Sequence, residues 1–374
     1  MANGTNAARK RTIGGGASIL LDGLRIAAAL TVVVFHASGQ WTTAYPAAHH
    51  QLGKWAHAAV VVFFVLSGYV IAFTTAAAAR GGRQYALARL SRLYSVALPA
   101  LLLTAVIEAV VARTDAALAA RYISGYSGLR YGLSAIFCNE FGFFSAAPPL
   151  ISPFWSLSFE FWYYLLFGLW VYCPAGPRKR WWLLGAGCLA GPKILLLLPI
   201  WLFGVLAYRL PKPNFLAAAP WVFVFLWLAV AGLVVSYLPA LPDAVGAKPL
   251  YMAGQFLTDW AVGAVVALAI WCLPTEVPAP AQSLAWTKPL RTLADLSFPL
   301  YVLHFPLLVA VRAVFGWRAN DLPQMVLATV LVCAVALALG RALESQRPAW
   351  RRLFSWLLDL RGNTRARPEP KRAK

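Results

Sequence analysis

The sequence contains ten runs of mainly apolar residues, most of them about as long as a helix that crosses a lipid bilayer. Such a helix needs about 20 residues because the hydrocarbon core is about 30 Å thick, and a helix satisfies its own backbone polar groups there. The runs therefore predict an all-α, polytopic membrane bundle of about ten transmembrane helices. They lie approximately at residues 19–38, 57–78, 93–112, 154–173, 180–192, 194–210, 218–238, 251–273, 296–315 and 323–343.

The composition excludes an ordinary soluble enzyme. Apolar residues make up 60% of the 374 residues and charged residues 12%, whereas soluble domains are about 45–50% apolar and about 25% charged. The 33 Lys and Arg residues against 13 Asp and Glu give a net charge of +20. In a membrane chain such an excess gathers in the loops on one side of the bilayer. We therefore expect membrane lipid as a partner, and no nucleic acid.

The basic residues are distributed unevenly between the two sets of connecting segments. With both termini in the cytoplasm, the cytoplasmic segments hold 24 of the 33 Lys and Arg residues and the external segments hold seven. Positive charge favours the cytoplasmic side, so we expect both termini to be cytoplasmic. The resulting organisation is a membrane domain at residues 19–345 between basic cytoplasmic tails at residues 1–18 and 346–374.

Three segments need a separate interpretation. The first run resembles a signal peptide, but Asp22 and Arg25 interrupt it, so we expect it to be retained. The run at 180–192 is short and predicts either a half-helix or a tight in-and-out pair with the next run. The stretch at 129–144 is apolar but contains charged residues, which leaves open whether it spans the membrane or re-enters it.

The first run carries two polar residues that a bilayer would not favour. Arg25 and His36 are 11 residues apart, which is about three helical turns plus about 20°, so both lie on one helix face about 16 Å apart. Intramembrane ionisable groups are candidates for function because their burial is costly. The alternative is that Arg25 snorkels or pairs with Asp22, and that His36 anchors the helix at the interface.

Arg89 and Arg92 lie at i and i+3 at the cytoplasmic end of the third run, in the segment RGGRQYALARLSRLY. Paired guanidinium groups suit phosphate recognition, because each is permanently charged and can donate two parallel hydrogen bonds. Basic residues at this position can also serve only to set the topology.

Further ionisable residues lie within other runs. Glu160 lies within the fourth run, about six residues from its external end, in PFWSLSFEFWYYLLF. His304 lies near mid-membrane in SFPLYVLHFPLL. Glu160 can hold a histidine or a sugar hydroxyl, whereas His304 can line a cavity or bond a neighbouring helix. Asp259 and Arg312 are buried charges that can pair with each other. Trp155, Ser156 and Tyr301 are further candidates for substrate contact or for structure.

The segments LDGLRIAAALTVVVFHA, FFVLSGYVI, RLSRLY, WSLSFEFWYYL and SFPLYVLHFPLL resemble, in order and spacing, the signatures of the acyltransferase 3 family of integral membrane acyltransferases. The phrase around Glu160 is most similar to the exopolysaccharide and O-antigen acetyltransferase branch. Three positions depart from the pattern, namely Val61, Ser95 and Phe161, so acceptor specificity is not carried over in detail.

The resemblance implies transfer of an acyl group, commonly acetyl, from cytoplasmic acyl-CoA to a hydroxyl of a cell-surface or exported carbohydrate. It implies that Arg25 and His36 are an essential pair and that Arg89 and Arg92 are the family's Arg-x-x-Arg element. Because CoA is polyanionic, we expect Arg89, Arg92 and Arg25 to hold its phosphates at the cytoplasmic face. His36 would act as a general base or be acylated transiently, with Glu160 orienting His36 or the sugar. A thioester donor needs no metal, and we expect none. The expected location is the bacterial inner membrane.

Two other functions remain open from the sequence. The acceptor of the acyl group can be a macrolide-type small molecule instead of a carbohydrate. A polysaccharide or lipid flippase, which is not an enzyme, would also place charged and aromatic residues inside a helical bundle. The sequence makes no prediction of the oligomeric state, and its five cysteines show no CxxC spacing and predict no disulfide.

Overall fold

The computed structural model describes residues 15–77, 81–123, 125–213, 218–274 and 287–363. All regular structure within these ranges is helical, which confirms the all-α prediction. The helices are α1 (Gly15–Trp41), α2 (Pro46–Ala77), α3 (Gly82–Thr114), α4 (Ala116–Tyr122), α5 (Ser127–Ala135), α6 (Trp155–Tyr172), α7 (Pro177–Ala190), α8 (Pro192–Arg209), α9 (Pro220–Tyr237), α10 (Phe256–Trp271), α11 (Thr287–Asp295), α12 (Ser297–Phe315), α13 (Leu322–Ser345) and α14 (Arg347–Asn363), with short 3₁₀ turns at Ser152–Phe154 and Tyr251–Ala253.

Each of the ten predicted runs lies on a helix. Seven of the helices, α1, α2, α3, α8, α9, α12 and α13, are long and apolar enough to cross a membrane. The other three runs coincide with α6, α7 and α10, which are shorter or more polar because of residues such as Glu160. The polytopic helical bundle is thus confirmed, and the number of ten crossings remains a prediction.

Proline and aspartate mark several helix starts. Pro177, Pro192 and Pro220 each occupy the first turn of a helix. A backbone N–H at this position has no acceptor within the helix, so proline, which lacks the N–H, costs no hydrogen bond there. Asp115 and Asp321 cap α4 and α13, since each side chain accepts a hydrogen bond from a backbone N–H in the first turn. Local sequence therefore determines where these helices begin.

The helix ends fall into two groups at opposite ends of the bundle. At one end Trp41 of α1 donates to Gln324 of α13 over 3.0 Å, and Arg312 of α12 donates to the carbonyl of Gln40 over 2.9 Å. At the other end Trp271 of α10 donates to the carbonyl of Leu210, next to α8. This arrangement fits helices that run alternately up and down. The charge distribution predicts that the first group is external.

Residues 129–144 do not form a spanning helix. α5 has only nine residues, and turns follow it. The ammonium of Lys193, at the start of α8, bonds the Glu140 carboxylate over 2.7 Å and the Phe144 carbonyl over 2.5 Å. Burial raises the pKa of Glu140, and the neighbouring Lys193 acts in the opposite direction. The segment is therefore a loop that is fixed to the start of α8, which the charge distribution predicts to be the external end.

A tight turn joins α7 and α8, so the short run at 180–192 lies on a helix of its own. Gly191 joins them with a φ of 81°, and a Cβ at this position would lie 2.7 Å from the backbone of Gly142. Only glycine tolerates both conditions. Gly191 therefore makes the tight turn at which the chain passes from α7 into α8.

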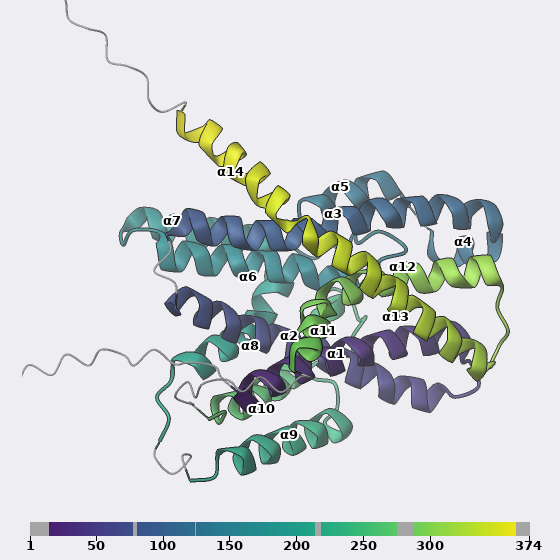
Figure 1. The fold of residues 1–374 in the computed structure, drawn as a ribbon, viewed down its shortest axis with the longest axis horizontal. Coiled ribbons are helices and arrows are strands. Elements are labelled where there is room, and N and C mark those ends of the chain that lie inside the picture. Colours follow the sequence, from purple (N-terminus) through teal and green to yellow (C-terminus); the bar gives the residue numbers. More distant parts are fainter. Residues whose placement is uncertain (1–14, 78–80, 124, 214–217, 275–286, 364–374) are drawn as a thin grey trace, which may run out of the picture.

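The predicted C-terminal tail contains a helix that the sequence analysis missed. α14 extends from the end of α13, and its far end points away from the bundle (Figure 1). Trp350 and Phe354 of α14 pack against Tyr94 of α3, and Arg83 forms a 2.7 Å ion pair with Asp359. Part of the 346–374 region is thus an ordered helix. Residues 1–14 and 364–374, which the tail predictions also include, lie outside the described residues.

Candidate functional site

A cavity in the bundle gathers most of the candidate residues. This inner cavity has about 710 Å³ of unfilled space, its open mouth included. Its charged lining comes from three helices, with Arg25 on α1, Arg89 and Arg92 on α3 and Glu160 on α6. Ser156 and Tyr301 also line it. Helices far apart in the sequence therefore bring together three of the predicted motifs.

The three arginines have no carboxylate partner within the described part of the chain, since none of them takes part in an ion pair there. The Arg89 guanidinium lies 5.8 Å from the centroids of the Tyr85 and Tyr164 rings, and its Nε is buried without a hydrogen bond. Arg92 lies 5.9 Å from the Phe298 ring. Aromatic faces stabilise a guanidinium and leave its outer N–H groups free for an anion.

Glu160 is held from two sides. Ser67 of α2 donates to Glu160 Oε1 over 2.8 Å, and the Tyr164 hydroxyl donates to the same oxygen. Trp201 of α8 donates in turn to Ser67 Oγ over 3.2 Å. The sequence allowed Glu160 to orient His36, but its hydrogen bonds within the described residues involve Ser67 and Tyr164. Glu160 thus belongs with the arginines of the inner cavity.

His36 faces a second histidine across the helix interface. The ring centroids of His36 on α1 and His304 on α12 are 5.2 Å apart, and the Phe305 ring lies 5.0 Å from His36. His304 Nδ1 lies 2.7 Å from the Tyr301 carbonyl, which can only accept, so Nδ1 carries a proton. His304 Nε2 is buried without a partner. In this tautomer His304 Nε2 carries a lone pair, and it is buried away from solvent.

Tyr301 joins the inner cavity to this histidine pair. Its hydroxyl lies 2.9 Å from Ser156 Oγ, and its ring centroid lies 6.1 Å from that of His304. His36 and His304 do not line the inner cavity themselves, whereas Tyr301 and Ser156 do. Arg25 and His36, which the sequence predicts on one helix face, thus have different surroundings. Arg25 lines the inner cavity, and His36 packs against His304.

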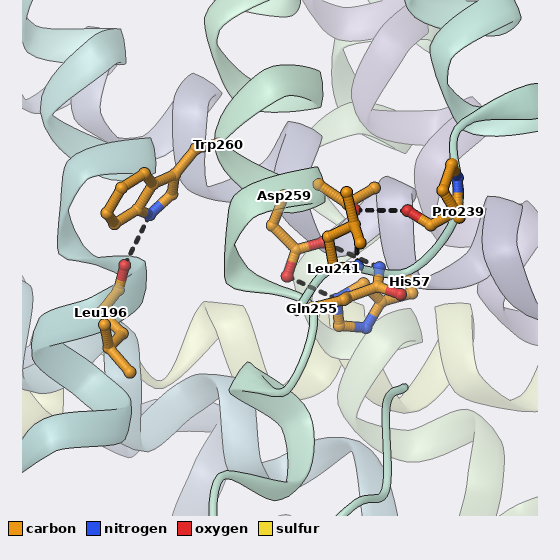
Figure 2. A network of polar contacts seen from close by, with 8 residues as sticks. His57, Leu196, Pro239, Leu241, Gln255, Asp259 and Trp260 are labelled. Atoms are coloured by element: carbon orange, nitrogen blue, oxygen red, sulfur yellow. Dashed lines mark hydrogen bonds and ion pairs between the residues drawn. The ribbon is translucent and has the colours of Figure 1, made fainter. Parts of the chain in front are cut away.

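The structure also contains a buried pair that the sequence analysis missed (Figure 2). His57 Nε2 lies 3.0 Å from Asp259 Oδ2, and Gln255 donates to the other carboxylate oxygen over 2.9 Å. The sequence left open a pairing of Asp259 with Arg312, but Asp259 contacts His57 and Arg312 donates to Gln40. The two members of the pair are 202 residues apart, and no local signal in the sequence links them.

Trp155 lies beside this pair. Its ring is nearly parallel to that of His57, with centroids 6.2 Å apart. Trp155 therefore contacts the buried pair and directly precedes Ser156, which lines the inner cavity. Within the described residues, no three His, Cys, Asp or Glu side chains come together in a way that would hold a metal ion.

Comparison with known proteins identifies the family. No curated protein and no solved structure matches the chain. The acyltransferase domain of the acyltransferase 3 family matches residues 19–341, and this range includes the inner cavity and both histidines. Because the match covers nearly the whole chain, the protein belongs to the acyltransferase 3 family of membrane acyltransferases.

Proposed function

We propose that the protein transfers an acyl group, in particular acetyl, from cytoplasmic acyl-CoA to a hydroxyl of a cell-surface or exported carbohydrate. The observation that carries this proposal is the convergence of Arg25, Arg89 and Arg92 on one cavity without a carboxylate partner in the described residues. A site with three guanidinium groups and one carboxylate, Glu160, carries a net positive charge and is suited to a polyanion, and coenzyme A carries several phosphates.

The remaining lining of the inner cavity suits the rest of the donor. Val60, Phe63 and Val70 of α2 provide an apolar wall along which a pantetheine arm can extend. Ser156 and Tyr301 are polar and lie next to the histidine pair. In this proposal the phosphates bind to the arginines, and the thioester lies near Tyr301.

The chemistry then depends on His36. Its imidazole removes the proton of the acceptor hydroxyl, the oxygen attacks the thioester carbonyl, and the C–S bond breaks to release CoA thiolate, which takes up the proton. Alternatively, His36 itself attacks and is acylated before the acceptor binds. The phenolic hydroxyl of Tyr301 can donate to the developing oxyanion in either case.

The proposal places the protein in a bacterial inner membrane, with donor and acceptor on opposite sides. The 24 basic residues of the predicted cytoplasmic segments support this orientation. An acceptor on the external side would approach the histidine pair from the end of the bundle that contains Gln40 and Trp41.

The test is acyl transfer by the purified protein in proteoliposomes. Acceptor-dependent release of CoA thiol from acetyl-CoA is expected, together with a carbohydrate product heavier by one acyl group in mass spectrometry. Release without a modified carbohydrate, but with an acylated macrolide, would shift the acceptor class. A flippase would release no thiol at all, and this result would overturn the proposal.

A further inference from the structure

The last described helix has an apolar face that the rest of the described chain leaves uncovered. α14 packs on α3 through Trp350 and Phe354. Its next apolar residues, Leu353, Trp356 and Leu357, are 43%, 58% and 41% exposed, and we call them the open face of α14. A contiguous exposed apolar patch marks a surface that contacts another molecule or a membrane.

Two exposed arginines, Arg351 and Arg352, form a second face of α14, which we call its cationic face. At about 100° per residue the open face spans about 100° of the helix circumference, and Arg352 lies about 40° beyond Trp356. Neither arginine forms an ion pair in the described part of the chain. An apolar face beside a cationic one is typical of a helix that lies in the interface of a membrane, with the cations at the headgroups.

The carboxylates nearest in sequence do not neutralise the cationic face. Asp359, the one carboxylate in the sequence of α14, forms a 2.7 Å ion pair with Arg83 of α3. Glu344, at the end of α13, lies 4.0 Å from Arg347. Because both carboxylates already have a cationic partner, the cationic face remains available to an anion outside the described chain.

α14 lies at the level where the sequence predicts lipid headgroups. It runs antiparallel to the first turns of α3, since Trp350 packs on Tyr94 and Asp359 pairs with Arg83. The third apolar run begins near residue 93, so these turns precede the predicted span on its cytoplasmic side. The far end of α14 points away from the bundle (Figure 1). This position is suited to contact with the cytoplasmic leaflet.

We propose that α14 binds anionic phospholipid of the cytoplasmic leaflet, with its cationic face at the headgroups and its open face among the acyl chains. The inference goes beyond the proposed acyl transfer and does not depend on it. Guanidinium groups favour a lipid with net negative charge over phosphatidylcholine, in which the choline offsets the phosphate. Tryptophan prefers the membrane interface, which fits the place of Trp356 on the open face.

The experiment measures which lipid surrounds the open face in the full-length protein. In a variant without the five native cysteines, Leu357→Cys is labelled with bimane and reconstituted in vesicles of phosphatidylglycerol and phosphatidylcholine. One or the other lipid carries a doxyl quencher on its acyl chain, at the same mole fraction. Both should quench the label. The initial slope for phosphatidylglycerol should be about fivefold steeper, which is the preference that one arginine near an anionic surface contributes.

Val330→Cys provides the lipid reference. Val330 is 61% exposed on α13, which is apolar and long enough to cross the membrane. A bimane label there should be quenched by both lipids with about equal slopes, because no cationic face lies beside it on α13.

The double substitution Arg351→Glu and Arg352→Glu tests the charge. It should lower the ratio of the two slopes at position 357 to about one or below, because carboxylates repel anionic headgroups. Quenching by phosphatidylcholine should persist through the open face. The matched control is Arg178→Glu with Arg180→Glu, which makes the same charge change at two exposed positions of α7 on the predicted cytoplasmic side and should leave the ratio unchanged.

The possible results separate the occupants of the open face. A label at position 357 that neither lipid quenches, while the label at position 330 is quenched, would show that water, a second copy of the chain or another protein lies there, and would overturn the inference. Equal slopes for the two lipids at position 357, or a preference that survives the double substitution in α14, would overturn it as well. The proposed function is tested separately, by release of CoA thiol.

Discussion

The three arginines of the inner cavity are partly buried and carry permanent charge. Burial of a cation costs free energy, and Glu160, the one carboxylate among the residues that line the cavity, offsets this cost only in part, since none of the three arginines forms an ion pair in the described residues. An anion that binds there would remove part of the cost. The unliganded protein is therefore expected to be less stable than its complex.

Coenzyme A should raise the melting temperature of the wild-type protein. A ligand at about 100 times its Kd stabilises the folded state by about 2.7 kcal/mol. Arg92→Ala should reduce this shift and raise KM for acetyl-CoA by about tenfold or more, because a charge-assisted hydrogen bond is lost. Thermal shift assays and initial rates measure both effects. Arg178→Ala is the control, since Arg178 is exposed at the start of α7, outside the inner cavity; equal effects of both substitutions would contradict the assignment.

His36→Ala should lower kcat by about 100-fold or more, because general base catalysis contributes about that factor. The variant should still insert into the membrane and bind CoA, since the arginines are retained. Single-turnover acyl transfer and CoA binding separate the two effects. His50→Ala, at an exposed position of α2, should keep the wild-type rate; a His36→Ala variant with full activity would exclude the role of His36.

The sequence predicts those parts of the site in which the residues lie close together on one helix, and it does not predict contacts between different helices. The shared face of Arg25 and His36 and the proximity of Arg89 to Arg92 follow from helical periodicity. The bond between Ser67 and Glu160 joins residues 93 positions apart, and the facing of His36 and His304 depends on how α1 packs against α12. Such contacts depend on tertiary packing, which periodicity does not encode.

At the scale of helices, the length of an apolar run predicts which segments can span the membrane. It does not detect helices that lack such a run. α14 lacks a long apolar run and is recognisable only by Trp350 and Phe354, which are four residues apart and both face Tyr94. The 129–144 stretch remained ambiguous because its apolar residues are compatible with both a span and a loop. The buried contact of Lys193 with Glu140 resolves it as a loop.

The glycine of the FFVLSGYVI segment has a packing role at the crossing of α2 and α8. A Cβ on Gly68 would lie 2.0 Å from the Trp201 carbonyl oxygen, and a Cβ on Gly204 would lie 2.0 Å from that of Val65. Small residues let two membrane helices approach closely. This contact also sets the position of Ser67, and through it that of Glu160.

Gly68→Ala should therefore destabilise the protein by about 1–3 kcal/mol or more, because the helices must separate. We expect a lower melting temperature in detergent and a lower yield of folded protein in size-exclusion chromatography. Gly185→Ala is the matched control within α7, where a Cβ would meet nothing within 4 Å. A Gly68→Ala variant as stable as Gly185→Ala would show that the close approach of the helices is not required.

At the scale of the whole molecule, the elements of the proposed site lie at different levels of one bundle. The inner cavity contains Arg89 and Arg92 near the start of α3, which the charge distribution predicts to be cytoplasmic. Tyr301 lines the same cavity, and its ring lies 6.1 Å from that of His304, which faces His36. In the proposed function, a donor and an acceptor on opposite sides of the membrane meet at the histidines without either one crossing.

The predicted orientation has a direct test. In a variant without the five native cysteines, Arg178→Cys should be protected from a membrane-impermeant maleimide in intact cells, and Arg318→Cys should react. Arg178 belongs to the predicted cytoplasmic segments, and Arg318 belongs to the predicted external segments and has an 82% exposed side chain. Permeabilised cells, in which both positions should react, provide the control. The opposite labelling pattern would place the three arginines on the external side, where a cytoplasmic acyl-CoA could not reach them, and the whole direction of transfer would have to be reversed.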